Sequence, residues 1–205
     1  MIITDPMEIE KKSFEIITAE MAGSTVLPEN ELVLKRVIHT SADFDYIENL
    51  KFSDNAVNVA IAAMKSQCVI VTDTQMVKSG INKVAAEIGV EVHCFMSDDD
   101  VAAEAKQRGV TRAIVSMEKA ARLKKPCIMA IGNAPTALLC LYDMIVEKKF
   151  TPVLIIGAPV GFVNVVESKE QIMKAGIPYI VAAGRKGGSP IAAAICNALL
   201  YQIKR

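Results

Sequence analysis

The sequence predicts an α/β fold built on a doubly wound, parallel sheet of five strands. Five short apolar runs, rich in Val and Ile, alternate with stretches of helical character; they occupy residues 68–72, 90–95, 127–131, 153–156 and 179–182. Buried strands separated by helices favour a parallel sheet whose right-handed crossovers place helices on both faces. The chain is 52% hydrophobic but only 5% aromatic, with no Trp, which suits aliphatic helices packed closely on such a sheet.

The five strands are expected in the flavodoxin-like order 2-1-3-4-5, with the N-terminal helices packed outside the sheet. A first helix is predicted from Pro6, capped by Asp5, to about Ala22, and a second over 29–39. The later helices are predicted at 54–64, 74–87, 98–109, 111–123, 134–147, 165–175 and 189–203. Because the sequence shows no repeat, low-complexity tract or linker, we expect one domain over residues 1–205.

Charge and cysteine usage restrict the partners and the compartment. Basic and acidic residues number 23 each, so no net field would attract nucleic acid or an anionic membrane. Five widely spaced cysteines without a CxxC motif indicate a reduced, cytoplasmic compartment without disulfides. The N-terminus does not resemble a signal peptide, and no apolar stretch reaches the ~20 residues that a membrane span needs. We expect a cytoplasmic protein.

The segment 32–45, LVLKRVIHTSADFD, is where the sequence points to chemistry. If it begins as a helix, Leu32, Arg36 and His39 lie on one face at i, i+4 and i+7. His39 is the leading acid–base candidate, and a partly exposed surface histidine is the alternative interpretation. The other histidine, His93, lies in a predicted strand and is interpreted as a core residue. Two histidines so far apart disfavour a catalytic zinc site, and residues 98–100 (DDD) are interpreted as helix capping, so we expect no metal.

Polar or glycine-rich turns follow four of the predicted strands, at residues 73–74, 132–136, 157–161 and 184–190. Ligands of parallel sheets bind beyond this carboxyl edge, and we expect His39 and Arg36 to face the same cavity. Asn133 is predicted to cap the helix after it, and Ser189 the helix that begins at Pro190. Residues 184–189, called the glycine turn below, also carry Arg185 and Lys186, which favours a carboxylate or phosphate ligand. Ordinary βα loops are the alternative, since GxGxxG after a strand, GxxxxGK[ST] and GxSxG are absent.

Ser13 lies between Ile9 and Ile17 on the apolar arc of the first predicted helix. Its hydroxyl could bond back to its own helix, which the residues alone favour, or could be presented to a buried ligand. The last predicted helix contains IAAAICNALL, which is apolar almost all round. Such a helix is buried either in the core or in a subunit contact, and the pattern leaves both open.

Four motifs, RVIHTSADFD, GNAPTALL, GAPVGFVNVVESKE and GRKGGSPIAAA, resemble the precorrin-8X methylmutase family of cobalamin biosynthesis, including its cobalt-precorrin-8 form. The resemblance covers nearly the whole chain. It implies an isomerase that moves a methyl group from C11 to C12 of the corrin macrocycle and yields hydrogenobyrinate, or cobyrinate when cobalt is present. It also implies a flavodoxin-like homodimer that holds its tetrapyrrole near the subunit interface and uses no cofactor.

The resemblance also implies site residues. The catalytic histidine of the family falls on His39, and substrate-binding residues fall on Ser13, Arg36 and Arg112. It thereby favours the ligand-facing interpretation of Ser13. Together with the turns at the sheet edge, the expected substrate-binding set is Ser13, Arg36, Arg112, Asn133, Gly187, Gly188 and Ser189. At Ser41-Ala42 some members of the family carry other small residues.

Two alternatives from other classes stay open on the residues. The first is a corrinoid-binding or carrier protein without catalysis, although the cobalt-ligating motif D-x-H-x-x-G is missing. The second is a phosphate- or nucleotide-binding enzyme that would use the glycine turn.

Overall fold

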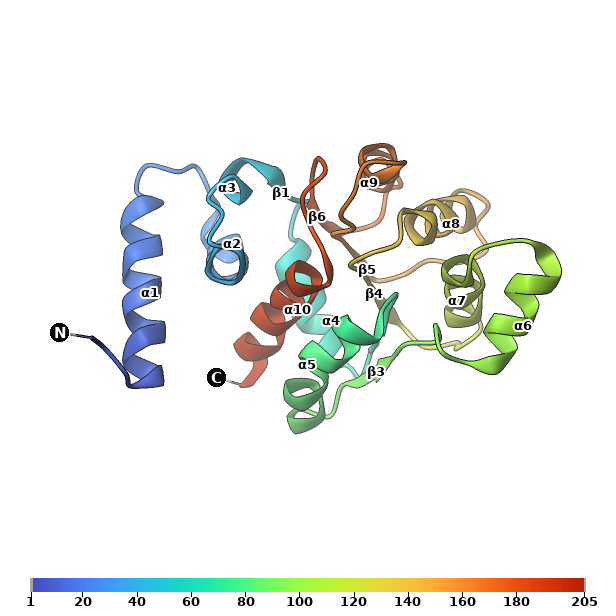
Figure 1. The fold of residues 1–205 in the computed structure, drawn as a ribbon, viewed down its shortest axis with the longest axis horizontal. Helices are drawn as coiled ribbons and strands as arrows, with labels where there is room; N and C mark the ends of the chain where they lie inside the picture. Colours follow the sequence, from blue (N-terminus) through green and yellow to red (C-terminus); the bar gives the residue numbers. More distant parts are fainter. Residues whose placement is uncertain (1, 205) are drawn as a thin grey trace.

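The computed structural model describes the backbone of residues 2–204 and their side chains other than those at 82 and 204, and it contains a mixed sheet (Figure 1). The sheet has six strands in the order β1-β6-β5-β4-β2-β3. They are β1 (Leu50–Phe52), β2 (Val69–Thr72), β3 (Glu91–His93), β4 (Cys127–Ile131), β5 (Leu154–Gly157) and β6 (Tyr179–Ala182). Strands β2 to β6 are parallel and lie in the order predicted for the five apolar runs.

The prediction of a purely parallel, five-stranded sheet is wrong, because β1 adds an antiparallel edge. Leu50 pairs with Ala182 and Phe52 with Ile180. The strand is only three residues long and follows a short helix, α3 (Tyr46–Asn49), directly. A single turn of helix followed by three extended residues leaves no periodic apolar pattern, so neither element could be predicted from the sequence.

The remaining helices begin and end close to the predicted residues. They are α1 (Pro6–Glu20), α2 (Pro28–Ser41), α4 (Ala56–Lys65), α5 (Gln75–Glu87), α6 (Asp99–Arg108), α7 (Arg112–Ala121), α8 (Pro135–Val146), α9 (Val165–Met173) and α10 (Ser189–Lys204). The side chain of Asp5 caps α1 by accepting a hydrogen bond from the N–H of Glu8. Asn133 does not cap α8 as predicted, since the cap residue is Ala134 and makes no side-chain bond.

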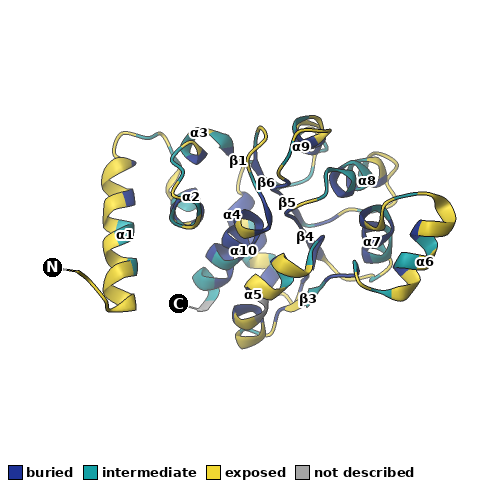
Figure 2. Ribbon diagram, in the orientation of Figure 1, coloured by how far each residue is buried: buried dark blue, intermediate teal, exposed yellow. Residues whose placement is uncertain are grey.

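Alternating strand residues divide the interior into two apolar cores, one on each face of the sheet (Figure 2). In β4, Ile128 and Ala130 face the core formed with α4, α5 and α10, whereas Cys127, Met129 and Ile131 face the core formed with α7 and α8. Helix α10 packs against α2, α4 and α5, so its apolar surface belongs to the core of one chain. Helix α2 covers α10, and α1 packs on α2 at one end of the molecule (Figure 1).

All five cysteines are free, and Cys68, Cys94, Cys127 and Cys196 are buried. Burial raises the pKa of the Cys196 thiol to about 12, which keeps it protonated and unreactive. Within the described residues, no helix is both long enough and apolar enough to cross a membrane.

Candidate active site

The side chain of Phe14, on α1, brings together two of the predicted site residues on α2. Its ring stacks on the imidazole of His39, with the centroids 5.3 Å apart, and the guanidinium of Arg36 lies 4.8 Å from its centre. Arg36 also forms an ion pair with Glu10, Nη1 to Oε1 at 2.8 Å. Arg36 and His39 therefore lie on the same face of α2, as their spacing predicted, and α1 supplies the surface against which both rest.

A cleft of about 720 Å³ opens beside this group, between α1, α2 and α10. Its walls are apolar at Met7, Phe14, Leu32 and Tyr201 and charged at Glu10, Lys11, Glu15, Lys35 and Arg36. Arg36 lines the cleft, but His39 and the glycine turn lie outside its lining. The expectation that all three face one cavity is thus not met within this cleft.

The glycine turn is instead joined to the end of α2 by an ion pair network. The ammonium of Lys186 lies 2.6 Å from Oδ2 of Asp43 and 2.6 Å from Oδ2 of Asp45. This contact holds the pKa of the Asp43 carboxyl below its usual range. Both carboxylates follow directly on the last turn of α2, which ends at Ala42 in the left-handed conformation with φ of 52°. The turn of helix that carries His39 is therefore linked to the glycine turn.

The glycine turn lies closely against the loop that follows β5. The N–H of Gly188 donates to the carbonyl oxygen of Ala158 at 2.7 Å, and a Cβ on Gly187 would lie only 2.4 Å from that oxygen. Only glycine fits at position 187 for this reason. The hydroxyl of Ser189, a buried residue, bonds to that of Thr74, Oγ to Oγ1 at 2.9 Å.

The turn after β4 is filled from within by a carboxylate. Asp73 is 1% exposed and accepts hydrogen bonds from the backbone N–H groups of Gly132, Asn133 and Ala134 at 2.7, 2.8 and 2.7 Å. Burial raises the pKa of Asp73, and the three N–H donors oppose that rise. The backbone N–H groups of residues 132–134 are thus occupied, while the side chain of Asn133 is exposed to a ligand.

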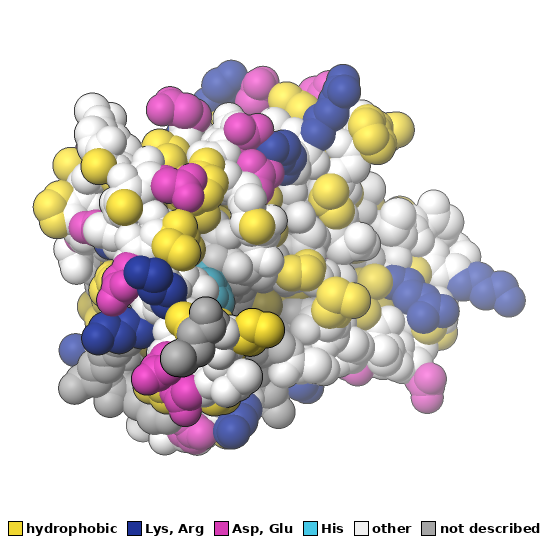
Figure 3. Space-filling view, turned by 60° about the vertical axis from the view of Figure 1, so that its left-hand side comes forward, with side chains coloured by type: hydrophobic (Ala, Val, Ile, Leu, Met, Phe, Trp, Pro, Cys, Tyr) yellow, Lys and Arg dark blue, Asp and Glu magenta, His cyan; other side chains and the backbone are white. Residues whose placement is uncertain are grey.

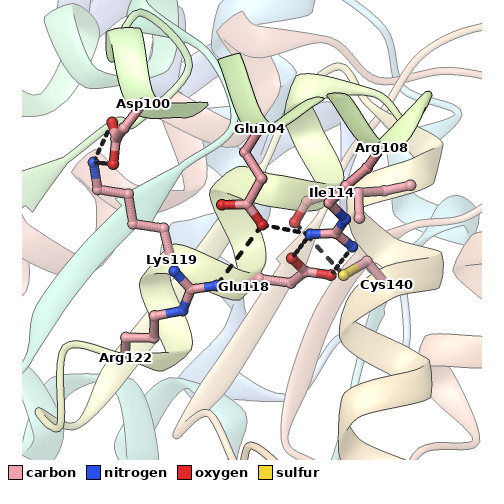
Figure 4. A network of polar contacts seen from close by, with 8 residues as sticks. All are labelled: Asp100, Glu104, Arg108, Ile114, Glu118, Lys119, Arg122 and Cys140. Carbon is pink, nitrogen blue, oxygen red and sulfur yellow. Dashed lines mark hydrogen bonds and ion pairs between the residues drawn. The ribbon is translucent and has the colours of Figure 1, made fainter. Parts of the chain in front are cut away.

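Neither Ser13 nor Arg112 has a hydrogen bond or ion pair to Arg36 or His39 within the described part of the chain. The hydroxyl of Ser13 donates to the carbonyl of Ile9 at 2.8 Å, the bond that its helix position predicted. Arg112 is the first residue of α7, which lies at the opposite end of the molecule from α1 (Figure 1). Beside it, α6 and α7 are held together by an ion pair of Arg108 with Glu118, Nη2 to Oε1 at 2.8 Å (Figure 4). One chain does not bring Arg112 to His39.

His93 and the acidic residues 98–100, to which the sequence assigned no catalytic role, do not contact this group. His93 is not a core residue: it lies half-buried on the edge strand β3, 3.2 Å from Oε2 of Glu91. Asp98 begins α6 without a side-chain cap bond and pairs with Lys119 instead. Among the residues that the structure describes, no group of three or more His, Cys, Asp or Glu side chains is arranged to hold a metal ion.

The sequence predicted a polar turn at residues 73–74 but not that Asp73 is a buried carboxylate, and the buried Lys169 was missed. The ammonium of Lys169 donates to the carbonyls of Gly184 and Lys186, each at 2.8 Å. A signal was present, because Val165, Lys169 and Ile172 follow the spacing of one helix face and the other two are apolar. A lysine inside such an apolar face indicates a buried polar contact.

Comparison with known proteins identifies the family. The family model described as precorrin-8X methylmutase matches residues 8–202. The chain belongs to the precorrin-8X methylmutase family. It is 46% identical to the cobalt-precorrin-8 methylmutase of Leptospira interrogans, over 94% of this chain and 91% of that protein, and 45% identical to that of Priestia megaterium, over 97% and 88%.

A solved structure agrees with this membership. The crystal structure of precorrin-8X methylmutase from Thermus thermophilus superimposes with a TM-score of 0.89 and 36% identity, over 96% of each chain. The activity of the chain is accordingly that of a methylmutase, an isomerase of cobalamin biosynthesis.

Proposed function

We propose that this chain moves the methyl group from C11 to C12 of precorrin-8X, or of cobalt-precorrin-8, with His39 as the proton partner of the macrocycle. The observation that carries the proposal is the group of His39, Phe14 and Arg36 beside the cleft. Its apolar walls suit a flat macrocycle, and its basic side chains suit the acetate and propionate carboxylates around that macrocycle.

The shift is intramolecular, so the protein need only bind, orient and exchange a proton. His39 donates a proton or a hydrogen bond to the macrocycle as the electrons move, and takes it back when the methyl group has arrived. The ring of Phe14 stacks on the imidazole and supports one of its two faces. Arg36 binds a substrate carboxylate, which replaces the carboxylate of Glu10 in its ion pair.

We further propose that the active form is a homodimer. Met7 is 74% exposed on α1, and Ile9 and Ile16 are exposed on the same helix. Figure 3 shows hydrophobic side chains lying among acidic and basic ones on this side of the molecule. In a two-fold dimer in which the α7 end of the second copy packs over this surface, these side chains would be covered and the second copy would supply its Arg112 to the His39 group.

Absorption spectroscopy of the purified protein with each substrate tests the function. Precorrin-8X and cobalt-precorrin-8 are mixed with the chain in separate cuvettes, and the spectrum is followed as the conjugated system of the ring changes. We expect conversion to hydrogenobyrinate or to cobyrinate, and the faster reaction identifies the preferred substrate. Tight binding of both without any new spectrum would contradict the proposal and would support a carrier.

A further inference from the structure

The side chain of Lys169, on α9, is enclosed in the fold although it carries a charge. Its exposed fraction is 0%, and its two described partners are the carbonyl oxygens of Gly184 and Lys186. Burial lowers its pKa to about 8, with no contribution from any neighbouring charge. Burying an ammonium without a counter-charge opposes folding, so a residue of this kind needs a compensating role.

The two carbonyl contacts fix which way the peptide groups of the glycine turn point. In a trans peptide the C=O of one residue and the N–H of the next are antiparallel, and no cis peptide occurs in the described residues. Because the carbonyls of Gly184 and Lys186 point at Lys169, the N–H groups of Arg185 and Gly187 point away from it. Neither N–H has a backbone or side-chain acceptor within the described part of the chain.

The carbonyl oxygen of Arg185, which lies between these two peptide groups, also has a protein partner. It accepts a hydrogen bond from the N–H of Gly161 at 3.2 Å. Three successive carbonyls of the turn are thus bonded to the protein, and the two N–H donors oriented by Lys169 have no acceptor within the described residues. Beside them the guanidinium of Arg185 lies 5.6 Å from the ring centre of Phe162, an exposed aromatic side chain. Two free donors, a cation and an apolar ring suit a carboxylate carried on an apolar macrocycle.

We propose that Lys169 is a positioning residue that shapes the glycine turn into a binding site for a side-chain carboxylate of the tetrapyrrole. The inference rests on the proposed function. Lys169 does not touch the substrate, because it lies on the carbonyl side of the turn. It acts through the peptide groups, by orienting the N–H donors of Arg185 and Gly187 toward the carboxylate.

Equilibrium binding of the product tests this role, with hydrogenobyrinate and its methyl ester as the two probes. The variants are Lys169→Met, which keeps most of the length of the side chain but removes its donors, and Lys174→Met, the same change at an exposed lysine at the end of α9. We expect K169M to bind the acid about 10-fold more weakly, the loss of a hydrogen bond to a charged group. The ester, which offers no carboxylate, should bind K169M and the wild type within about twofold, and K174M should match the wild type for both probes.

The ester separates positioning from a general structural effect. Equal weakening of acid and ester by K169M would overturn the inference, because a distorted fold does not distinguish a carboxylate from its ester. Unchanged binding of the acid would overturn it as well. If K169M shows no cooperative unfolding transition, Lys169→Leu takes its place, since it also removes the donors and has a smaller side chain, and the same comparison of acid with ester applies to it. Failure of the wild type to bind hydrogenobyrinate would instead contradict the proposed function.

Discussion

Asp73 and Lys169 are buried charges that make hydrogen bonds to the backbone at the carboxyl edge of the sheet. The carboxylate of Asp73 accepts from three N–H groups of one turn, and the ammonium of Lys169 donates to two carbonyls of another. Each satisfies backbone groups that would otherwise lack a partner in the interior. At the scale of residues, the buried charges of Asp73 and Lys169 therefore determine the conformation of these turns in the absence of substrate.

Asp73→Asn should destabilise the fold by about 2 kcal/mol, because the amide group of Asn cannot accept from all three N–H groups and leaves one unpaired. Asp54→Asn is the matched control, since Asp54 is exposed. Urea unfolding measures the free energy of unfolding of both variants. Equal stabilities would show that the three hydrogen bonds contribute nothing beyond the desolvation of the carboxylate.

The buried ammonium also predicts a pH dependence of stability. Burial lowers the pKa of Lys169 to about 8 in the folded chain, from an ordinary pKa of 10.5. Between these values the unfolded chain binds more protons, so this group makes the folded state more stable as pH rises. The free energy of unfolding of the wild type, relative to K169M, should therefore increase from pH 7 to pH 9.5, by on the order of 2 kcal/mol. If the free energies of unfolding of the wild type and K169M change with pH in the same way, the lowered pKa of Lys169 is contradicted.

At the scale of elements, the turn after β4 and the start of α10 are in close contact. A Cβ on Gly132 would lie 2.8 Å from the Cα of Ser189, which is backbone and cannot rotate away. Gly132→Ala should therefore displace the start of α10 and destabilise the fold by about 2 to 3 kcal/mol. Gly109→Ala is the control, because a Cβ there meets nothing within 4 Å and only the φ of 65° is unfavourable. It should cost about 1 kcal/mol, and thermal unfolding of both variants compares them. A G132A protein as stable as G109A would show that the contact relaxes easily.

Much of the fold could be predicted because periodic apolar patterns determine the long helices and the five parallel strands. The exceptions have physical causes. β1 and α3 are too short to show a period, and their position depends on pairing with β6 far along the chain. The cap predicted at Asn133 failed because the Asp73 carboxylate, distant in sequence, takes the N–H groups of that turn.

The site could be predicted in part. Arg36 and His39 share a face because helical spacing alone decides this, but their meeting with Phe14 depends on how α1 packs on α2. Helical spacing indicates that Lys169 is buried, but local sequence does not encode that it lies against the glycine turn, so this contact was missed. The resemblance to the family implied that His39, Ser13 and Arg112 belong to one site. Sequence spacing could not predict this, because the three residues lie on different helices.

At the scale of the whole molecule, the distance of Arg112 from His39 predicts that two chains share each site. In a two-fold dimer of this kind, mixing His39→Ala with Arg112→Ala gives heterodimers in which one site carries both substitutions and the other neither. Two inactive proteins should then recover activity on mixing and subunit exchange, to about a quarter of the wild type. Methyl-shift rates before and after mixing measure this, and sedimentation equilibrium reports the dimer. If a confirmed mixed dimer recovers no activity, the two residues do not form one site across the two chains, and the proposal of a shared site is contradicted.

The account as a whole depends on the imidazole of His39 acting on the bound macrocycle. The most direct measurement is single-turnover absorption spectroscopy of His39→Ala, with the product dissociation constant determined in parallel and His93→Ala as the matched control. We expect H39A to bind the product within about threefold of the wild type and to react at least about 100-fold more slowly, the usual effect of losing an acid–base group, while H93A behaves as the wild type. A reaction by H39A at the wild-type rate would contradict the account.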